Sequence, residues 1–275
     1  MFKNRNLVIA TKHKKELVIA PLFEKELNVK CFVPNDFDSD FFGTFTGEIE
    51  RKLDPLSTAR KKCLMAMEQT NCDLGIANEG SFGPHPTIFF ANADDEILIL
   101  IDLKNNLEIV VRELSLDTNF NVTKVNLYSE LIEFAEKVDF PSHAIILKND
   151  VSSFVKGIQS WDLLEESYIK LSKNNSLIVA ETDMRALHNP KRLKVIKKAT
   201  IKLIEKIKSV CPECNTPGFG MVSAKSGLPC GCCRSETKSI LSHLYKCQKC
   251  KFEMEKMYPH EKQFEDPMYC DYCNP

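Results

Sequence analysis

The sequence predicts an α/β protein, in which a mixed sheet is flanked by helices, with a small zinc-ribbon-like module at its C-terminal end. Two observations carry this prediction. Short apolar runs alternate with segments of helical period over about the first 208 residues, as expected when strands and helices alternate along the chain. Nine of the twelve cysteines lie in the last 65 residues, and eight of these form pairs separated by two residues.

The charge distribution supports a division of the chain. Residues 1–190 carry 21 Lys and Arg against 29 Asp and Glu, so this region is acidic by eight charges. Residues 191–210 carry eight basic residues and one acidic one, and residues 211–275 are balanced at eight each. We therefore predict an α/β domain over residues 1–208 and a zinc-binding module over residues 209–275.

Turn residues, caps and hydrophobic period locate the elements of the α/β domain. Asp54 is a suitable N-cap for a helix that begins at Pro55, and Asn189 with Pro190 starts the last helix. An L-K-N-N turn after residue 102 predicts a hairpin. In chain order, we expect strands at residues 7–10, 30–33, 74–77, 87–92, 96–102, 107–114, 143–148 and 176–181. We expect helices at residues 14–27, 55–70, 128–138, 161–172 and 190–210.

Four C-x-x-C pairs in the tail predict two structural zinc sites. Two residues between thiolates allow both sulfurs to bind one tetrahedral ion, and the gaps of 15 and 19 residues suit zinc ribbons. We expect consecutive pairs to share an ion, with interleaved pairing as the alternative. Cys232, between two ligands, either replaces Cys233 or stays free. The expected ligands are Cys211, Cys214, Cys230 and Cys233 for one site, and Cys247, Cys250, Cys270 and Cys273 for the other.

The charge of this module argues against nucleic-acid binding. The tail is neutral before metal binds, and each zinc held by four thiolates has a formal charge of about −2, so the loaded module repels phosphates. Structural stabilisation or contact with a protein partner is the favoured role.

Three segments of the body resemble a known enzyme family. They are the A-T-K-H-K-K-E that follows the first strand, the helical S-T-A-R-K-K-C-L-M-A, and D-L-G-I-A-N-E-G-S-F. In order and spacing these are similar to the house-cleaning purine nucleoside triphosphate pyrophosphatases, over about residues 5–115. His13 stands where that family has Asn, Glu16 where it has Lys, and Ser81 where it has a second Gly. The whole chain also resembles a bacterial family of unknown function that joins an α/β region to C-terminal cysteine pairs.

The resemblance implies a hydrolase of phosphate anhydrides that uses Mg²⁺ or Mn²⁺ on a nucleotide or related metabolite. Glu79 follows an apolar strand and opens a loop rich in Gly and Pro, a place where α/β sheets bind ligands. Glu79 is therefore our first candidate for holding the metal or orienting water, although a plain surface carboxylate is the alternative. Glu48 and Glu50 lie in a long loop expected to overhang the same edge.

Phosphate contacts are expected from two basic segments. Thr11, Lys12, Lys14 and Lys15 lie at the start of a helix, where free backbone N–H groups attract anions. The second segment, E-T-D-M-R-A-L-H, follows a strand and offers Asp183 as a further catalytic carboxylate and Arg185 as a further phosphate contact. An Arg-braced turn is the alternative for this second segment.

A second function stays open at this point. The departures at His13 and Glu16 favour a non-enzymatic zinc-ribbon interaction module on an inactive α/β domain. The first residues lack the apolar stretch of a secretory signal, and no apolar run approaches the length of a membrane span, so we expect a cytoplasmic protein without membrane contact.

Overall fold

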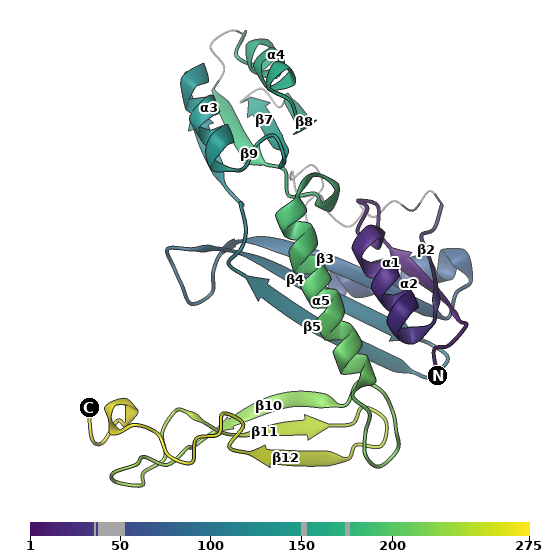
Figure 1. Cartoon of the computed structure of the whole chain (residues 1–275), viewed down its shortest axis with the longest axis vertical. Coiled ribbons are helices and arrows are strands. Elements are labelled where there is room, and N and C mark those ends of the chain that lie inside the picture. Colours follow the sequence, from purple (N-terminus) through teal and green to yellow (C-terminus); the bar gives the residue numbers. More distant parts are fainter. Residues whose placement is uncertain (36, 38–52, 150–152, 174–176) are drawn as a thin grey trace. The chain divides into compact units, whose positions relative to one another are not determined.

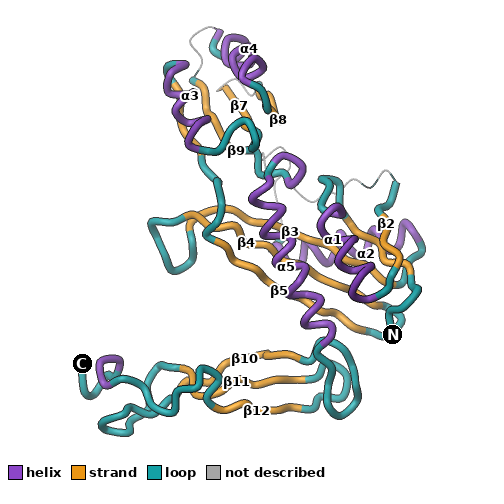
Figure 2. Tube along the Cα trace, in the orientation of Figure 1, coloured by secondary structure: helices purple, strands orange, loops and turns teal. Residues whose placement is uncertain are grey.

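The computed structural model describes residues 1–35, 37, 53–149, 153–173 and 177–275, and the chain divides into two compact units, Met1–Leu203 and Ile204–Pro275. The α/β class is confirmed, with helices flanking the sheets (Figures 1 and 2). Glu48 and Glu50 lie outside the described residues. None of the helices in the described part of the chain is long and apolar enough to cross a membrane.

The first sheet of unit 1 has five strands in the order β2-β1-β3-β4-β5. The pairs β2–β1 and β1–β3 are parallel, and β3–β4 and β4–β5 are antiparallel, so this sheet is mixed. Its strands are β1 (Asn6–Ala10), β2 (Lys30–Phe32), β3 (Leu74–Pro84), β4 (Asn92–Asp102) and β5 (Leu107–Ser115).

Helices α1 (Glu16–Leu27) and α2 (Pro55–Thr70) connect the parallel strands. In the strand order, β2 lies on one side of β1 and β3 on the other. The connection from β1 to β2 and the connection from β2 to β3 therefore cross the sheet in opposite directions. Right-handed crossovers therefore place the two helices on opposite faces. Apolar residues of α2 pack on the sheet face that carries Val8, Ala77 and Ile99. We call this face the α2 face.

Helix α2 has the predicted bounds, because its ends are encoded locally. The Asp54 carboxylate accepts a hydrogen bond from Ser57 N, Pro55 occupies the first turn, and Asn71 ends the helix in the left-handed conformation. Helix α5 (Pro190–Lys208) begins in the same way, since Asn189 Oδ1 accepts a hydrogen bond from Arg192 N.

A second, antiparallel sheet of four strands has the order β6-β9-β7-β8 and packs on α3 (Tyr128–Lys137) and α4 (Trp161–Leu171) around a common apolar core. The body strands are thus distributed over two sheets, and β6 and β8 were not predicted. The strands are β6 (Val122–Val125), β7 (Ile145–Asn149), β8 (Phe154–Ile158) and β9 (Ile178–Thr182).

Two expectations about the first sheet were wrong. Glu79 does not follow the strand but lies inside β3, which pairs with β4 as far as Pro84 and Asn92. Gly80 and Gly83 remain extended, since neither has a positive φ. The separate strand expected at residues 87–92 does not form, and only Asn92 is in a strand, as the first residue of β4. His85 Nδ1 accepts hydrogen bonds from the backbone N–H groups of Thr87 and Ile88 and closes a turn there.

Unit 2 contains a three-stranded antiparallel sheet in the order β10-β11-β12. The cysteine pairs lie before β10 and after each of the three strands. The strands are β10 (Gly220–Ser226), β11 (Ile240–Lys246) and β12 (Glu253–Met257).

Candidate functional site

Eight cysteines of unit 2 form two groups of four. Within each group all four sulfurs lie within 4.8 Å of one another. The shortest separations between sulfurs of different pairs are 3.6 to 3.8 Å. Zinc–sulfur bonds of about 2.3 Å at tetrahedral angles separate sulfurs by about 3.8 Å. The residues therefore fit zinc. The first group is Cys211, Cys214, Cys247 and Cys250, and the second is Cys230, Cys233, Cys270 and Cys273.

The expected pairing of consecutive C-x-x-C motifs was wrong, because the two sites are interleaved. The start of β10 pairs with the end of β11, since Gly220 lies opposite Lys246. The cysteine pair before β10 therefore meets the pair after β11 at one end of the sheet. The pairs after β10 and after β12 meet at the other end, where both strands finish. Antiparallel order thus combines the first pair with the third and the second with the fourth.

The turns around the cysteines have a common geometry. The residue after the second cysteine has a positive φ in three of the four pairs, at Asn215, Arg234 and Lys251. A hydroxyl follows closely in the first two pairs, with Cys214 Sγ 3.2 Å from Thr216 Oγ1. The hydrogen bonds of Thr216 lower the pKa of Cys214 to about 6, and the neighbouring Ser235 has the same effect on Cys233. Such thiols readily become thiolates, the form that binds metal.

The remaining cysteine and the two histidines of unit 2 lie outside these groups. Cys232 is exposed, and Cys233 occupies the ligand position. His243 and His260 pack edge to face, with ring centroids 5.7 Å apart, and belong to neither cysteine group. Within the described residues, no other set of three or more His, Cys, Asp or Glu side chains converges on a point that could hold an ion.

Unit 1 contains a group of buried charged residues, which we call the buried charged cluster. It lies just beyond the end of β1. Strand β1 pairs with β3 only from Val8 to Ala10, so beyond Ala77 the edge of β3 that faces β1 has no neighbouring strand among the described residues. Ligands of α/β sheets bind beyond the carboxyl ends of strands. Helix α1 begins only six residues after the end of β1, and helix N-termini attract anions. The members of the cluster are Lys15, Lys62, Glu79, Asp94, Glu96 and Arg192, all buried.

Glu79 and Lys62 form an ion pair on the α2 face of the sheet. Lys15 reaches the open edge of β3 and donates a hydrogen bond from Nζ to the carbonyl of Asn78, at 3.1 Å. Burial, reinforced by the positive charge of Arg192, lowers the pKa of Lys15 to about 7 despite the opposing charge of Glu79. Lys15 is therefore partly neutral at physiological pH.

Glu96 and Arg192 form an ion pair in which both side chains are fully buried. Arg192 Nε donates to Glu96 Oε1 at 2.7 Å, and its Nη1 donates to the carbonyl of Met184. The guanidinium also lies 5.0 Å from the ring centroid of Phe82. Gly80 makes room for this pair, because a Cβ there would lie 2.5 Å from Arg192 Nη2 and 2.6 Å from Glu96 Oε1.

Two buried polar atoms near this cluster have no hydrogen-bond partner among the described residues. They are Thr11 Oγ1 and Asn78 Oδ1. Burial, followed by the charge of Glu96, raises the pKa of Asp94 to about 8, so its neutral form predominates at pH 7. Buried polar atoms without partners are uncommon and indicate a site for water, an ion or a ligand.

The predicted phosphate contacts divide into exposed and buried residues. Lys12 and Lys14 are exposed at the start of α1, whereas Thr11 and Lys15 are buried. Burial lowers the pKa of His188 in the segment after β9, with the charge of Asp183 opposing this and those of Arg185 and Lys14 adding to it.

Asp183 and Arg185 bind each other, as in the Arg-braced turn. Arg185 donates to the Asp183 carboxylate from its backbone N, Nε and Nη2, at 2.6 to 3.2 Å, and Gly157 N donates to the same carboxylate. Asp183 is buried. Glu181 forms a separate ion pair with Lys148 at 2.7 Å, so the two acidic residues have different partners.

Sequence reasoning missed four members of the cluster, although the pattern contained signs of them. Lys62 and Arg192 occupy the apolar stripes of their helices, one turn from Ala66 and Ile196 respectively. Asp94 and Glu96 lie on the same face of β4 as the buried Leu98 and Leu100, which follow them at a spacing of two residues. Charged residues rarely occupy positions that the helix or strand periodicity places in the core, so their presence there indicates such a site.

Comparison with known proteins shows the family of this chain. No curated protein matches it. The crystal structure of protein VC0702 from Vibrio cholerae is similar at 12% identity and a TM-score of 0.31, over 74% of this chain and 94% of that chain. A score at this level carries no argument. The family model described as a domain of unknown function (DUF6671) matches residues 62–275. Since this match spans most of the sequence, the chain belongs to the DUF6671 family.

Proposed function

We propose that this chain is a zinc-binding protein whose body hydrolyses a phosphate anhydride in a nucleotide or a related phosphorylated metabolite, with Mg²⁺ or Mn²⁺. The observation that carries the proposal is the buried charged cluster beside the carboxyl end of β1 and the start of α1. The two zinc ions are structural in this proposal. The protein acts in the cytoplasm, where a reducing environment keeps the eight thiols available as ligands.

The energetics of the cluster favour a functional role over a stabilising one. Removing charges from water costs several kcal/mol per ion, and buried ion pairs often contribute little net stability. This cluster buries three cationic and three acidic side chains. Lys15 is the most telling, because its lowered pKa reports a net unfavourable environment for the ammonium form. Perturbed ionisable groups of this kind concentrate at functional sites.

The proposed roles follow from position and charge. Lys12 and Lys14 are exposed beside the first turn of α1 and bind phosphate oxygens. Glu79 holds the divalent ion, which is compatible with one or two carboxylates and several waters. When bound, the ion neutralises phosphate charge and acidifies a water. Lys62, the partner of Glu79, orients that carboxylate.

Lys15 and Asp183 have less direct roles in this proposal. Lys15 moves a proton at its Nζ close to neutral pH, since its pKa is about 7. Asp183 and Arg185 brace the loop after β9, because they bind each other. Nucleic acid is not a partner of the proposed site, whose ligand is a small phosphorylated molecule.

A protein-interaction role for the zinc module is the second candidate. The observation that favours it is a set of large apolar and aromatic side chains that are exposed in unit 2. Sets of this kind commonly mark contact surfaces. The exposed residues include Met221, Val222, Met254, Met257, Tyr269 and Tyr272.

The test measures pyrophosphate and phosphate release by the zinc-loaded protein from a panel of nucleoside triphosphates with Mg²⁺ or Mn²⁺. We expect turnover that falls at least 100-fold in Glu79→Gln. Glu108→Gln is the matched control, because Glu108 forms an ion pair with Arg60 of α2 and is half-exposed. Equal zinc content and thermal midpoints show that both variants are folded. Absence of turnover from folded, metallated wild type refutes the hydrolase and leaves the interaction module.

A further inference from the structure

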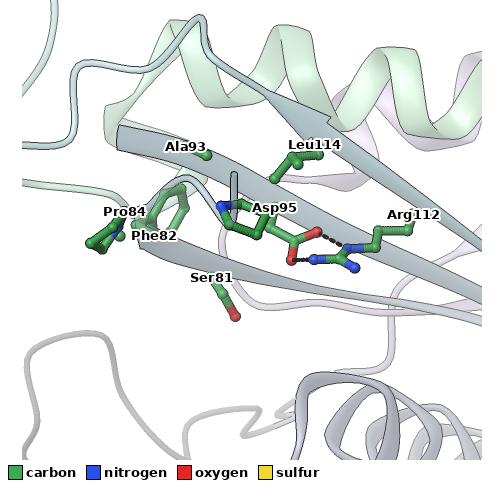
Figure 3. A pocket seen from close by; sticks show the side chains of 9 residues that line it. Ser81, Phe82, Pro84, Ala93, Asp95, Arg112 and Leu114 are labelled. Carbon is green, nitrogen blue, oxygen red and sulfur yellow. Dashed lines mark hydrogen bonds and ion pairs between the residues drawn. The ribbon is translucent and has the colours of Figure 1, made fainter. Parts of the chain in front are cut away.

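A hollow of about 240 Å³ lies where β3 ends, β4 begins and β5 ends (Figure 3). The strand register places its main lining residues on one face of the sheet. Ser81 lies opposite Asp95, which in turn lies opposite Leu114, and Gly83 lies opposite Ala93. Pro84, the last residue of β3, and Pro86, from the turn that follows, also line the hollow.

This hollow continues the face that carries Glu79. Side chains two residues apart on a strand point to the same face, about 7 Å apart, so Ser81 is the next residue after Glu79 on the α2 face. The same holds on β4, where Ile97 lies opposite Glu79 and Asp95 opposite Ser81. The hollow and Glu79 therefore lie on the same face of β3, one side-chain position apart.

The chemistry of the hollow suits a flat, partly polar ring. Arg112 Nε and Nη2 donate to the two oxygens of Asp95, both at 2.7 Å, as Figure 3 shows. A two-bond pair of this kind is nearly planar, and arginine stacks on aromatic rings. Leu114, Pro84 and Pro86 supply apolar surface around this flat pair. Stacking on a guanidinium is tolerant of the ring's identity, because every nucleobase has a π face.

Size restricts what the hollow can hold. Sites for drug-sized ligands have volumes of about 300–1,000 Å³, so a hollow of about 240 Å³ holds one ring system and not a complete nucleotide. The phosphates of such a ligand must lie outside the hollow.

We propose that this hollow is the subsite for the aromatic heterocycle of the substrate, a nucleobase or similar ring, stacked on the Asp95–Arg112 pair while its phosphates extend along β3 toward Glu79. This inference rests on the proposed function for the direction of the phosphates. The recognition of the ring depends on the hollow alone.

Gly83 offers a way to fill the hollow with little disturbance of the fold. An added Cβ at Gly83 has no atom within 4 Å, and the residue lacks a positive φ. Valine suits a strand better than glycine does. Gly83→Val therefore occupies the subsite, and Arg112→Lys keeps the charge but removes the flat two-bond pair. Ser223→Val, at an exposed position of β10, is the control for an added valine.

The experiment compares KM for a nucleoside triphosphate with the inhibition constant of inorganic tripolyphosphate, which has the phosphates but no ring. We expect Gly83→Val to raise KM at least tenfold and Arg112→Lys several-fold. The tripolyphosphate constant and kcat should change less than twofold, and Ser223→Val should change neither. Equal effects on both ligands, or no effect on either, overturn the subsite and leave the hydrolase intact.

A binding measurement separates the two proposals if wild type shows no turnover. Ligand-observed NMR with adenosine and guanosine, which lack phosphates, reports the hollow directly. Binding to wild type that Gly83→Val abolishes supports the ring subsite even where the hydrolase has failed. Failure of both nucleosides to bind overturns the subsite.

Discussion

Replacing Lys15 with methionine should stabilise the protein and abolish the proposed activity together. Lys15, the residue immediately before α1, is buried, and burial lowers its pKa from 10.5 to about 7. The folded state must therefore either bury an ammonium or release its proton. Methionine has a similar length and carries no charge, so the variant avoids this cost while it removes a cation and proton carrier from the site.

The magnitude follows from the pKa values. The difference between 10.5 and about 7 corresponds to about 5 kcal/mol, at ~1.4 kcal/mol per pH unit. Against this, the variant loses the hydrogen bond from Lys15 to the Asn78 carbonyl, which costs about 1–3 kcal/mol if the carbonyl stays buried without a partner. We expect a net gain of about 2–4 kcal/mol at pH 7.

The pH dependence has a defined sign. Between about pH 7 and 10.5 the unfolded chain binds more protons at Lys15 than the folded protein does, so wild-type stability rises with pH in that range. The advantage of Lys15→Met is therefore complete at and below about pH 7, and it decreases toward pH 10.5.

Urea unfolding of the zinc-loaded protein at pH 6, 7 and 9.5 measures these differences. Far-UV circular dichroism is the main probe, and the single tryptophan, Trp161 in α4, gives a fluorescence signal from unit 1. Lys14→Met is the matched control, because Lys14 is exposed and its replacement should change stability by less than about 0.5 kcal/mol. If Lys15→Met lowers stability by more than 1 kcal/mol at every pH, the buried ammonium is a structural support and our reasoning is wrong.

Three further outcomes are expected. Wild type should lose stability as the pH rises from about 4 to 8, because the raised pKa of Asp94 makes the folded protein bind more protons than the unfolded chain in that range. Asp94→Asn should remove this loss, and parallel stability curves of both proteins would contradict the prediction. Cys250→Ser should lower zinc content from two ions per chain, whereas Cys232→Ser should retain both, as measured by mass spectrometry under native conditions. Gly75→Ala should cost about 1–3 kcal/mol by calorimetry, since the new Cβ would lie 2.6 Å from Met67 Cγ; an unchanged melting temperature would show that α2 yields.

The elements that sequence located well are those whose ends are encoded within a few residues. Helix α2 has its cap at Asp54, Pro55 in its first turn and a left-handed Asn71 at its end, so local chemistry determines both bounds. Strand β3 is the opposite case. Its second half, N-E-G-S-F-G-P, has the composition of a loop, and only the eleven-residue partner strand β4 keeps it extended. The local sequence pattern does not show which distant segments will pair, so the length of β3 could not be predicted from it.

The candidate site shows the same division. The four cysteine pairs could be predicted because each is a local motif, while their combination into two groups depends on the order of β10, β11 and β12. The pair of Glu96 and Arg192 joins residues 96 positions apart, and neither is near the other in any sequence window. Lys15 was predicted as a phosphate contact from its place before α1, but its burial depends on tertiary packing.

The interleaving of the two zinc sites has a consequence for how the module responds to metal supply. One ion closes the chain from Cys214 to Cys247, over 33 residues, and the other closes it from Cys233 to Cys270, over 37 residues. These loops overlap, so the first ion to bind already restricts part of the second loop and lowers its entropy of closure. We therefore expect metal loading to be cooperative, with a Hill coefficient above one in a zinc titration. On this expectation, a narrow range of free zinc concentration separates the metal-free module from the fully metallated one.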